Sequence, residues 1–153
     1  MKLSYAYLED GYAPQGFKIP DLPVVYLALK AGRLRARGPA IIDTGFDGEV
    51  LANYEVASIF RDVEPKGVVE LESPLHGRAE FEVFEAEAYL CHEAKLISLG
   101  RTEVYVPTEP ELLSPEVLIG RGLINEWKLN LDAERSIVEV ELTVKERRLK
   151  QLY

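Results

Sequence analysis

Apolar residues in this chain alternate with polar ones or gather in short runs, a pattern typical of β-strands. From Ala79 to Ala88 they alternate with glutamates, and the parity of the alternation shifts between Val83 and Phe84. This shift predicts a β-bulge or a strand that changes faces. The middle of the chain lacks a long helical pattern, so we expect a mostly β fold. The predicted strands and short apolar runs are 24–30, 34–37, 39–42, 50–52, 68–71, 79–88, 96–99, 104–106, 117–120, 129–131 and 137–142.

Glycine and proline residues indicate where the chain turns. Residues 9–23 contain five of them, so we expect a loop or an irregular arm there. The stretches 73–77 and 132–135 each predict the turn of a hairpin. Gly100 lies between two short apolar runs and predicts a further hairpin. From residue 68 onward we therefore expect mainly hairpins.

Two short helices are predicted between these strands. Asn53 is placed to cap a brief helix that would bury Val56 on its inner side. Leu123, Ile124 and Trp127 have helical spacing and predict the second helix, directly after a buried run. Both are too short to change the fold class.

The composition indicates a single globular unit. The chain has 153 residues, of which 47% are hydrophobic, enough to build a core and to argue against intrinsic disorder. We divide it into an N-terminal arm or loop (1–23), one domain (24–144) and a polar C-terminal tail (145–153). Lys and Arg number 18 against 26 Asp and Glu, which argues against nucleic acid as the main partner. Sparse Gln and Asn beside many charged residues favour a thermostable protein.

The cysteine and histidine content restricts the chemistry further. Cys91 is the single cysteine, so an intrachain disulfide is excluded and a reducing, cytoplasmic location is expected. Cys91, His76 and His92 cannot form a four-ligand zinc site, and we expect neither a metal nor a cofactor. The first residues lack the apolar run of a signal peptide, and no run approaches the roughly 18 apolar residues of a membrane span. A membrane partner is therefore not expected.

Two buried apolar runs end at a glycine and carry the candidate chemistry. The first, residues 40–45, places Asp43, Thr44 and Gly45 at the end of a hydrophobic strand. A buried carboxylate is costly unless it accepts hydrogen bonds or shares a proton. Taken alone, this tripeptide is more typical of an Asx turn than of a catalytic site. The second run covers residues 117–120.

Residues 40–48 resemble the active-site loop of the retropepsin-like aspartic proteases, a retroviral-type, single-domain family, in its prokaryotic branch. Residues 117–124 resemble the second signature of that family, in which apolar residues, Gly and Arg precede a short helix. Residues 127–132 and 137–140 continue the resemblance, and a flap hairpin fits between the two signatures. The resemblance implies a closed acid-protease-type β-barrel with one short helix after the second glycine loop, in a homodimer.

The resemblance also assigns roles to individual residues. Asp43 resembles the catalytic aspartate, Thr44 the residue whose hydroxyl bonds across the twofold axis, and Gly45 the residue whose backbone contacts substrate. Gly120 would let the second loop approach the first, and Arg121 would form an ion pair with Asp47 of the same protomer. The residues expected to contact a bound peptide are Phe46, Asp47, Gly48 and, from the flap tip, Ser73, Pro74, Leu75, His76 and Gly77.

The chain carries one such aspartate motif, whereas the reaction uses two carboxylates that share one proton. One carboxylate activates water and the other protonates the carbonyl oxygen of the peptide. We therefore expect a homodimer with twofold symmetry in which each Asp43 contributes to one site. The expected function is that of an aspartic endopeptidase, a hydrolase acting on a peptide or an unfolded protein. The alternative is a catalytically silent domain of the same fold that binds peptides or dimerises.

Overall fold

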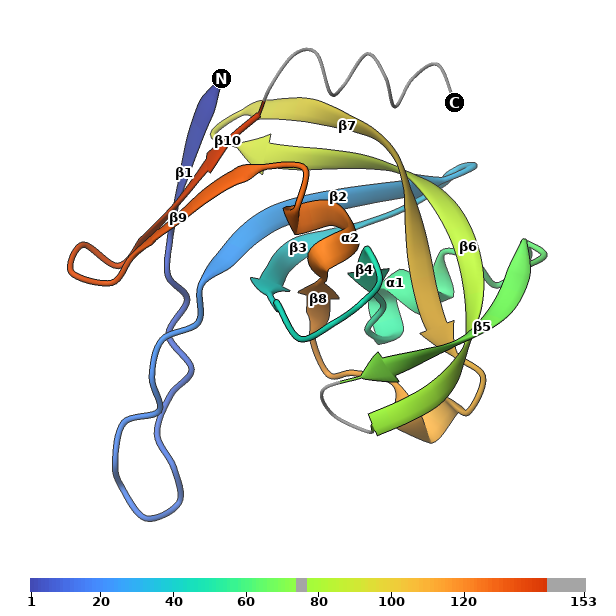
Figure 1. Cartoon of the computed structure of the whole chain (residues 1–153), viewed down its shortest axis with the longest axis horizontal. Coiled ribbons are helices and arrows are strands. Elements are labelled where there is room, and N and C mark those ends of the chain that lie inside the picture. The colour runs from blue at the N-terminus through green and yellow to red at the C-terminus, as the bar shows by residue number, and fades with distance from the viewer. Residues whose placement is uncertain (74–76, 143–153) are drawn as a thin grey trace.

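The computed structural model describes residues 1–73 and 77–142, and within them the chain is mostly β, as the sequence predicts (Figure 1). Six strands of this part of the chain form a closed barrel, because the first of them also pairs with the last. The predicted β-barrel is therefore confirmed. In order around the barrel the strands are β2 (Val24–Ala31), β3 (Leu34–Ile42), β8 (Val117–Ile119), β4 (Val50–Leu51), β7 (Lys95–Pro107) and β6 (Gly77–His92), and β5 (Gly67–Ser73) extends the sheet beyond β6.

A smaller antiparallel sheet lies beside the barrel and is built from β1 (Lys2–Ala6), β10 (Ile137–Glu141) and β9 (Lys128–Asp132) (Figure 1). The hairpin of β9 and β10 confirms the predicted one. β1 differs from the prediction, which placed its residues in an arm or loop. Leu3 and Tyr5 of β1 are buried in the core, and β1 pairs with a strand from the other end of the described chain. Local patterns cannot reveal a pairing over that separation.

At Val83 and Phe84 the buried apolar side chains of β6 switch from one face of the strand to the other, and no bulge forms there. Both side chains are buried, and the pairing of these residues with β7 is continuous. Phe84 belongs to the main hydrophobic core, whereas Phe81 belongs to a second, smaller one. The strand therefore contributes side chains to both cores along its length.

Gly100 lies within β7, so the hairpin predicted around it is wrong. The strand continues on both sides of the glycine, and the chain turns instead at Glu93 and Ala94. The register between β6 and β7 shifts between Ala88 and Tyr89, opposite Gly100, whose φ is +79°. Glycine adopts this conformation at little cost, and here it forms a β-bulge.

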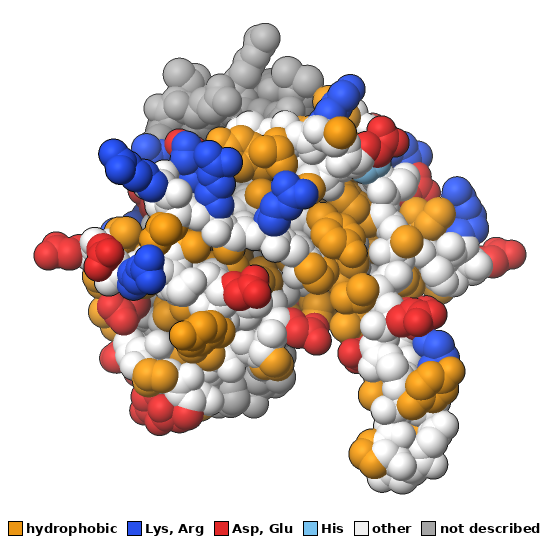
Figure 2. Space-filling model, turned by 180° about the vertical axis from the view of Figure 1, so that it is seen from behind, with side chains coloured by type: hydrophobic (Ala, Val, Ile, Leu, Met, Phe, Trp, Pro, Cys, Tyr) orange, Lys and Arg blue, Asp and Glu red, His pale blue; other side chains and the backbone are white. Residues whose placement is uncertain are grey.

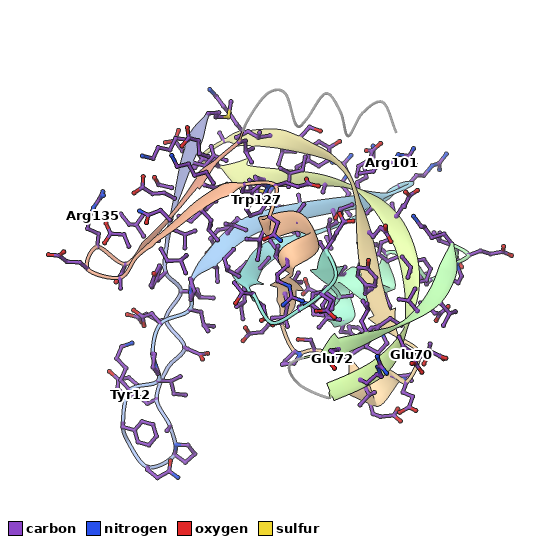
Figure 3. The ribbon with its side chains drawn as sticks, in the orientation of Figure 1. Tyr12, Glu70, Glu72, Arg101, Trp127 and Arg135 are labelled. Atoms are coloured by element: carbon purple, nitrogen blue, oxygen red, sulfur yellow. The ribbon has the colours of Figure 1, made fainter. Side chains whose placement is uncertain are left out.

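The two predicted helices are present and short. α1 (Tyr54–Ser58) begins after Asn53, whose side-chain oxygen accepts the Val56 N–H at 3.0 Å, which confirms the predicted cap. α2 (Arg121–Ile124) follows β8 and ends before Trp127. Trp127 lies beside α2 and packs against the main core (Figure 3). A 3₁₀ helix, η1 (Pro110–Leu112), precedes β8.

Residues 7–23 connect β1 to β2 as an extended arm, in agreement with the loop or arm predicted over 9–23 (Figure 1). The predicted turn residues 74–76 and the predicted tail 145–153 lie outside the described residues. None of the described helices has the length and hydropathy that crossing a membrane would require.

Candidate active site

Strand β8 lies between β3 and β4 and brings two distant loops together (Figure 1). β3 runs parallel to β8, with Ile42 opposite Ile119, while β4 runs antiparallel to β8, with Val50 opposite the same residue. The loop of residues 43–49 must therefore cross the end of β8, where residues 120–122 begin. The two glycine-ended runs of the sequence meet at this crossing.

Backbone hydrogen bonds join the loop of residues 43–49 to the end of β8 and the residues that follow it. They connect the two segments along the whole crossing, so the position of the loop depends on both. In each pair that follows, the first residue donates its N–H and the second accepts with its carbonyl. The pairs are Asp43 to Ile119 (2.9 Å), Gly120 to Glu49 (2.9 Å), Arg121 to Phe46 (2.9 Å) and Gly122 to Gly48 (3.1 Å).

Gly120 and Gly48 are required by this close approach. A Cβ atom at Gly120 would lie 2.2 Å from the Gly48 carbonyl oxygen and 2.6 Å from that of Phe46. A Cβ atom at Gly48 would lie 2.6 Å from a ring carbon of Tyr105. These two carbonyl oxygens belong to the backbone, which cannot move aside as a flexible side chain can, and the third nearby atom is a ring carbon of the buried Phe46. Gly120 therefore has the supporting position that the resemblance implies.

Asp43 stands at the end of β3 and is half-buried. Its carboxylate accepts the Gly45 N–H at 2.9 Å, and its carbonyl accepts the Phe46 N–H at 3.3 Å. The tripeptide is thus an Asx turn, and this turn orients the carboxylate. Thr44 and Gly45 are exposed beside it. The loop therefore presents a carboxylate, a hydroxyl and a stretch of backbone together at the surface of the protomer.

Arg121 forms the predicted ion pair with Asp47 within one protomer. Its Nη2 contacts Asp47 Oδ1, while its Nη1 donates to the Thr44 carbonyl oxygen at 3.0 Å. The side chains of Arg121 and Asp47 are 48% and 39% exposed, so the pair contributes no more than about 1 kcal/mol to stability. Its main effect is geometric, because it ties two points of the loop to the start of α2.

Phe46 and Gly48, both predicted to contact substrate, are buried instead. Phe46 is the one apolar side chain of the loop, and burying it contributes about 1.5–3 kcal/mol. Its ring meets that of Tyr105 edge-on, with the centroids 5.8 Å apart. Phe46 therefore anchors the loop and offers no side-chain surface to a substrate. The second core consists of Phe46, Leu51, Phe81 and Leu118, with Ile41, Leu71, Ala79 and Tyr105 packed against it.

The β5–β6 hairpin, which is the predicted flap, is anchored to this second core. Leu71 of β5 and Ala79 of β6 pack against it, and Ser73 pairs with Gly77 at the last described positions of the hairpin. The loop of residues 43–49 and the β5–β6 hairpin therefore pack on the same hydrophobic core. Of the predicted substrate contacts, Pro74, Leu75 and His76 lie outside the described residues.

Tyr105 supports the site, although no local pattern in the sequence points to it. Its ring contacts those of Phe46 and Phe81, with centroids 5.8 Å and 6.5 Å away. Burial, reinforced by the carboxylates of Glu103 and Glu49, raises the pKa of the Tyr105 hydroxyl above its ordinary value. A tyrosine in an alternating strand carries no local signal for this position, which depends on the pairing of β7 with β4.

Among residues 1–73 and 77–142, no group of three His, Cys, Asp or Glu side chains is placed to hold a metal ion. Neither the family models nor the curated proteins compared with this chain give a match. The candidate site therefore rests on the two sequence motifs and on the geometry of their crossing.

We expect Gly120→Ala to lower the free energy of unfolding by about 3 kcal/mol or more, because the added methyl group would overlap two backbone carbonyl oxygens. Urea unfolding measures this loss. Gly38→Ala is the matched control, since a Cβ atom at that position of β3 meets nothing within 4 Å. Equal stability of the two variants would contradict the close packing of the loops.

Proposed function

We propose that this protein is an aspartic endopeptidase of the retropepsin type, in which two copies of the chain form one active site. The observation that supports this most strongly is the crossing of the two loops. An ordinary Asx turn at the end of a strand forms without contacts to a second loop. Here Asp43 is positioned by its own turn and by a segment about 75 residues away along the chain. The Asp43 N–H donates to the Ile119 carbonyl, and the Arg121 side chain donates to the carbonyl of the adjacent Thr44.

A single protomer supplies half of the carboxylates that the reaction needs. The other acidic residues of the loop are engaged in supporting contacts, Asp47 with Arg121 and Glu49 with the Thr102 hydroxyl at 3.0 Å. Asp43 is left as the carboxylate available for chemistry. A second copy related by a twofold axis would bring an identical carboxylate to it.

In the proposed reaction the two Asp43 carboxylates share one proton, since like charges a few ångström apart cannot both ionise. The ionised carboxylate takes a proton from water while the water oxygen attacks the peptide carbonyl carbon. The protonated carboxyl gives its proton to the carbonyl oxygen. The tetrahedral intermediate then breaks its C–N bond: one carboxyl gives its proton to the leaving nitrogen, and the other carboxylate takes a hydroxyl proton from the intermediate. The products are an amine and a carboxylic acid, and the pair again holds one shared proton.

An extended peptide is the substrate that the surroundings of the loop favour. β5 is the last strand of the sheet and pairs with β6 alone among the described strands. Such an edge carries backbone N–H and carbonyl groups that can bind an extended segment. Gly45, in the loop of residues 43–49, is also exposed. We therefore expect unfolded or extended protein segments to be cleaved.

Asp43→Asn should reduce cleavage of a denatured, fluorescently labelled protein by at least about 100-fold, because the amide cannot accept the proton of water. Stability should change little, since the amide oxygen can still accept the Gly45 N–H. Asp132→Asn is the matched control, because Asp132 also accepts a backbone N–H within a turn, that of Arg135. It should keep full activity.

The same assay should show highest activity on the acidic side of neutrality. Activity rises as the pair loses its first proton and falls as it loses its second, because the reaction needs one carboxylate and one carboxyl. A rate that keeps rising into alkaline pH would contradict the proposal. Equal cleavage by wild type and Asp43→Asn would also contradict it.

Arg121→Ala should lower proteolysis about tenfold or more and weaken the dimer, while costing less than about 1 kcal/mol of stability. The reason is that Arg121 fixes the distance of Thr44 from α2, whereas the exposed ion pair stabilises little. Arg101→Ala is the control, because Arg101 pairs with Glu85 on the barrel away from the loop (Figure 3). Identical activity of both variants and wild type would refute the positioning role.

A further inference from the structure

The arm between β1 and β2 is a two-stranded ribbon with a defined backbone. Leu8 and Leu22 exchange N–H to carbonyl bonds of 2.9 Å and 2.7 Å at its base. Nearer the tip, the Ala13 N–H donates to the Phe17 carbonyl at 2.8 Å, and the Ile19 N–H donates to the Gly11 carbonyl at 2.9 Å. The strands of the ribbon are therefore held in one register over most of the arm.

The ribbon has little support from its own protomer. All of residues 9–18 except Ala13 are exposed, and Tyr12 and Phe17 are 72% and 63% exposed. No residue of 9–23 joins or packs against the two hydrophobic cores of the described chain. Figure 2 shows the arm standing clear of the rest of the molecule. An isolated two-stranded ribbon is only marginally stable in water, so this one needs a surface to pack against.

The base of the ribbon adjoins the candidate active site. Pro23, the last residue before β2, accepts the N–H of Ile42, which directly precedes Asp43, at 3.1 Å. From Leu8 to Ala13 the extended chain reaches about 17 Å. In Figure 1 the arm and the loop between β3 and β4 lie on the same side of the barrel. A second copy whose Asp43 approached this one would therefore lie within reach of the arm.

We infer that the ribbon of residues 8–22 is a dimerisation arm that packs Tyr12 and Phe17 on a second copy of this chain. The inference rests on the proposed function, because that function brings the second copy to this side of the molecule. By twofold symmetry each protomer gives an arm and receives one. Four aromatic side chains that bury about 150–250 Å² each would supply a large part of the roughly 1,600 Å² of a stable interface.

The test compares the double variant Tyr12→Ser/Phe17→Ser with wild type by sedimentation equilibrium. We expect the dimer dissociation constant to rise at least about tenfold, because buried aromatic residues dominate interface energetics. The control is Tyr54→Ser, which removes a 77% exposed tyrosine from α1 and should leave the dissociation constant unchanged. A dissociation constant unchanged in the double variant would overturn the inference, and so would an equal rise in the control.

Hydrogen exchange of the wild-type chain gives a second readout that needs no substitution. The amides of Ala13 and Ile19 should exchange more slowly as the protein concentration rises through the dissociation constant, whereas amides within β6 and β7 should not change. Exchange at Ala13 and Ile19 that is independent of concentration would overturn the inference.

The inference and the proposed function can fail separately. An arm-dependent dimer in which Asp43→Asn does not alter proteolysis would support the arm and overturn the protease. Proteolysis that requires Asp43 and a dimer, yet is indifferent to the double variant, would support the protease and overturn the arm.

Discussion

The close approach of two backbone segments at Gly120 and Gly48 is the constraint on which the candidate site depends. With β8 between β3 and β4, the loop that joins β3 to β4 must cross the end of β8. The crossing leaves no room for a side chain at Gly120, since a Cβ atom there would lie 2.2 Å from the Gly48 carbonyl oxygen. Because the crossing fixes the loop at both ends, Asp43 is held by the fold as well as by its own turn.

The side chains of the loop of residues 43–49 lie partly in the second core and partly at the surface. The buried part stabilises the loop, and the exposed part carries the candidate catalytic groups. Phe46 points into the second core, to which the β5–β6 hairpin is also anchored. Asp43, Thr44 and Gly45 face outward, and Arg121 ties that exposed part to α2. The buried side chain stabilises the loop by a few kcal/mol, whereas the exposed ion pair mainly sets geometry. A substitution can therefore alter the site in either of two separable ways.

The local features of this structure could be predicted from the sequence, and the long-range ones could not. Alternation and apolar runs predict most strands, Asn53 predicts the cap of α1, and the resemblance predicts the pairing of Asp47 with Arg121. The turn predicted at Gly100 is wrong because a glycine suits both a turn and a β-bulge, and the pairing with a neighbouring strand determines which of the two forms. The strand β1 and the inward direction of Phe46 depend on segments far away in the chain.

The central claim, that a second copy completes the site, is tested most directly by mixing the wild-type chain with Asp43→Asn at concentrations well above the dimer dissociation constant. If each active site needs Asp43 from both chains, a dimer with one variant chain is inactive. A fixed amount of wild type should then lose about half of its activity with an equal amount of variant, and about nine tenths with a ninefold excess, as random pairing requires. Activity that stays constant as the variant is added, under conditions where the chains exchange, would contradict the account.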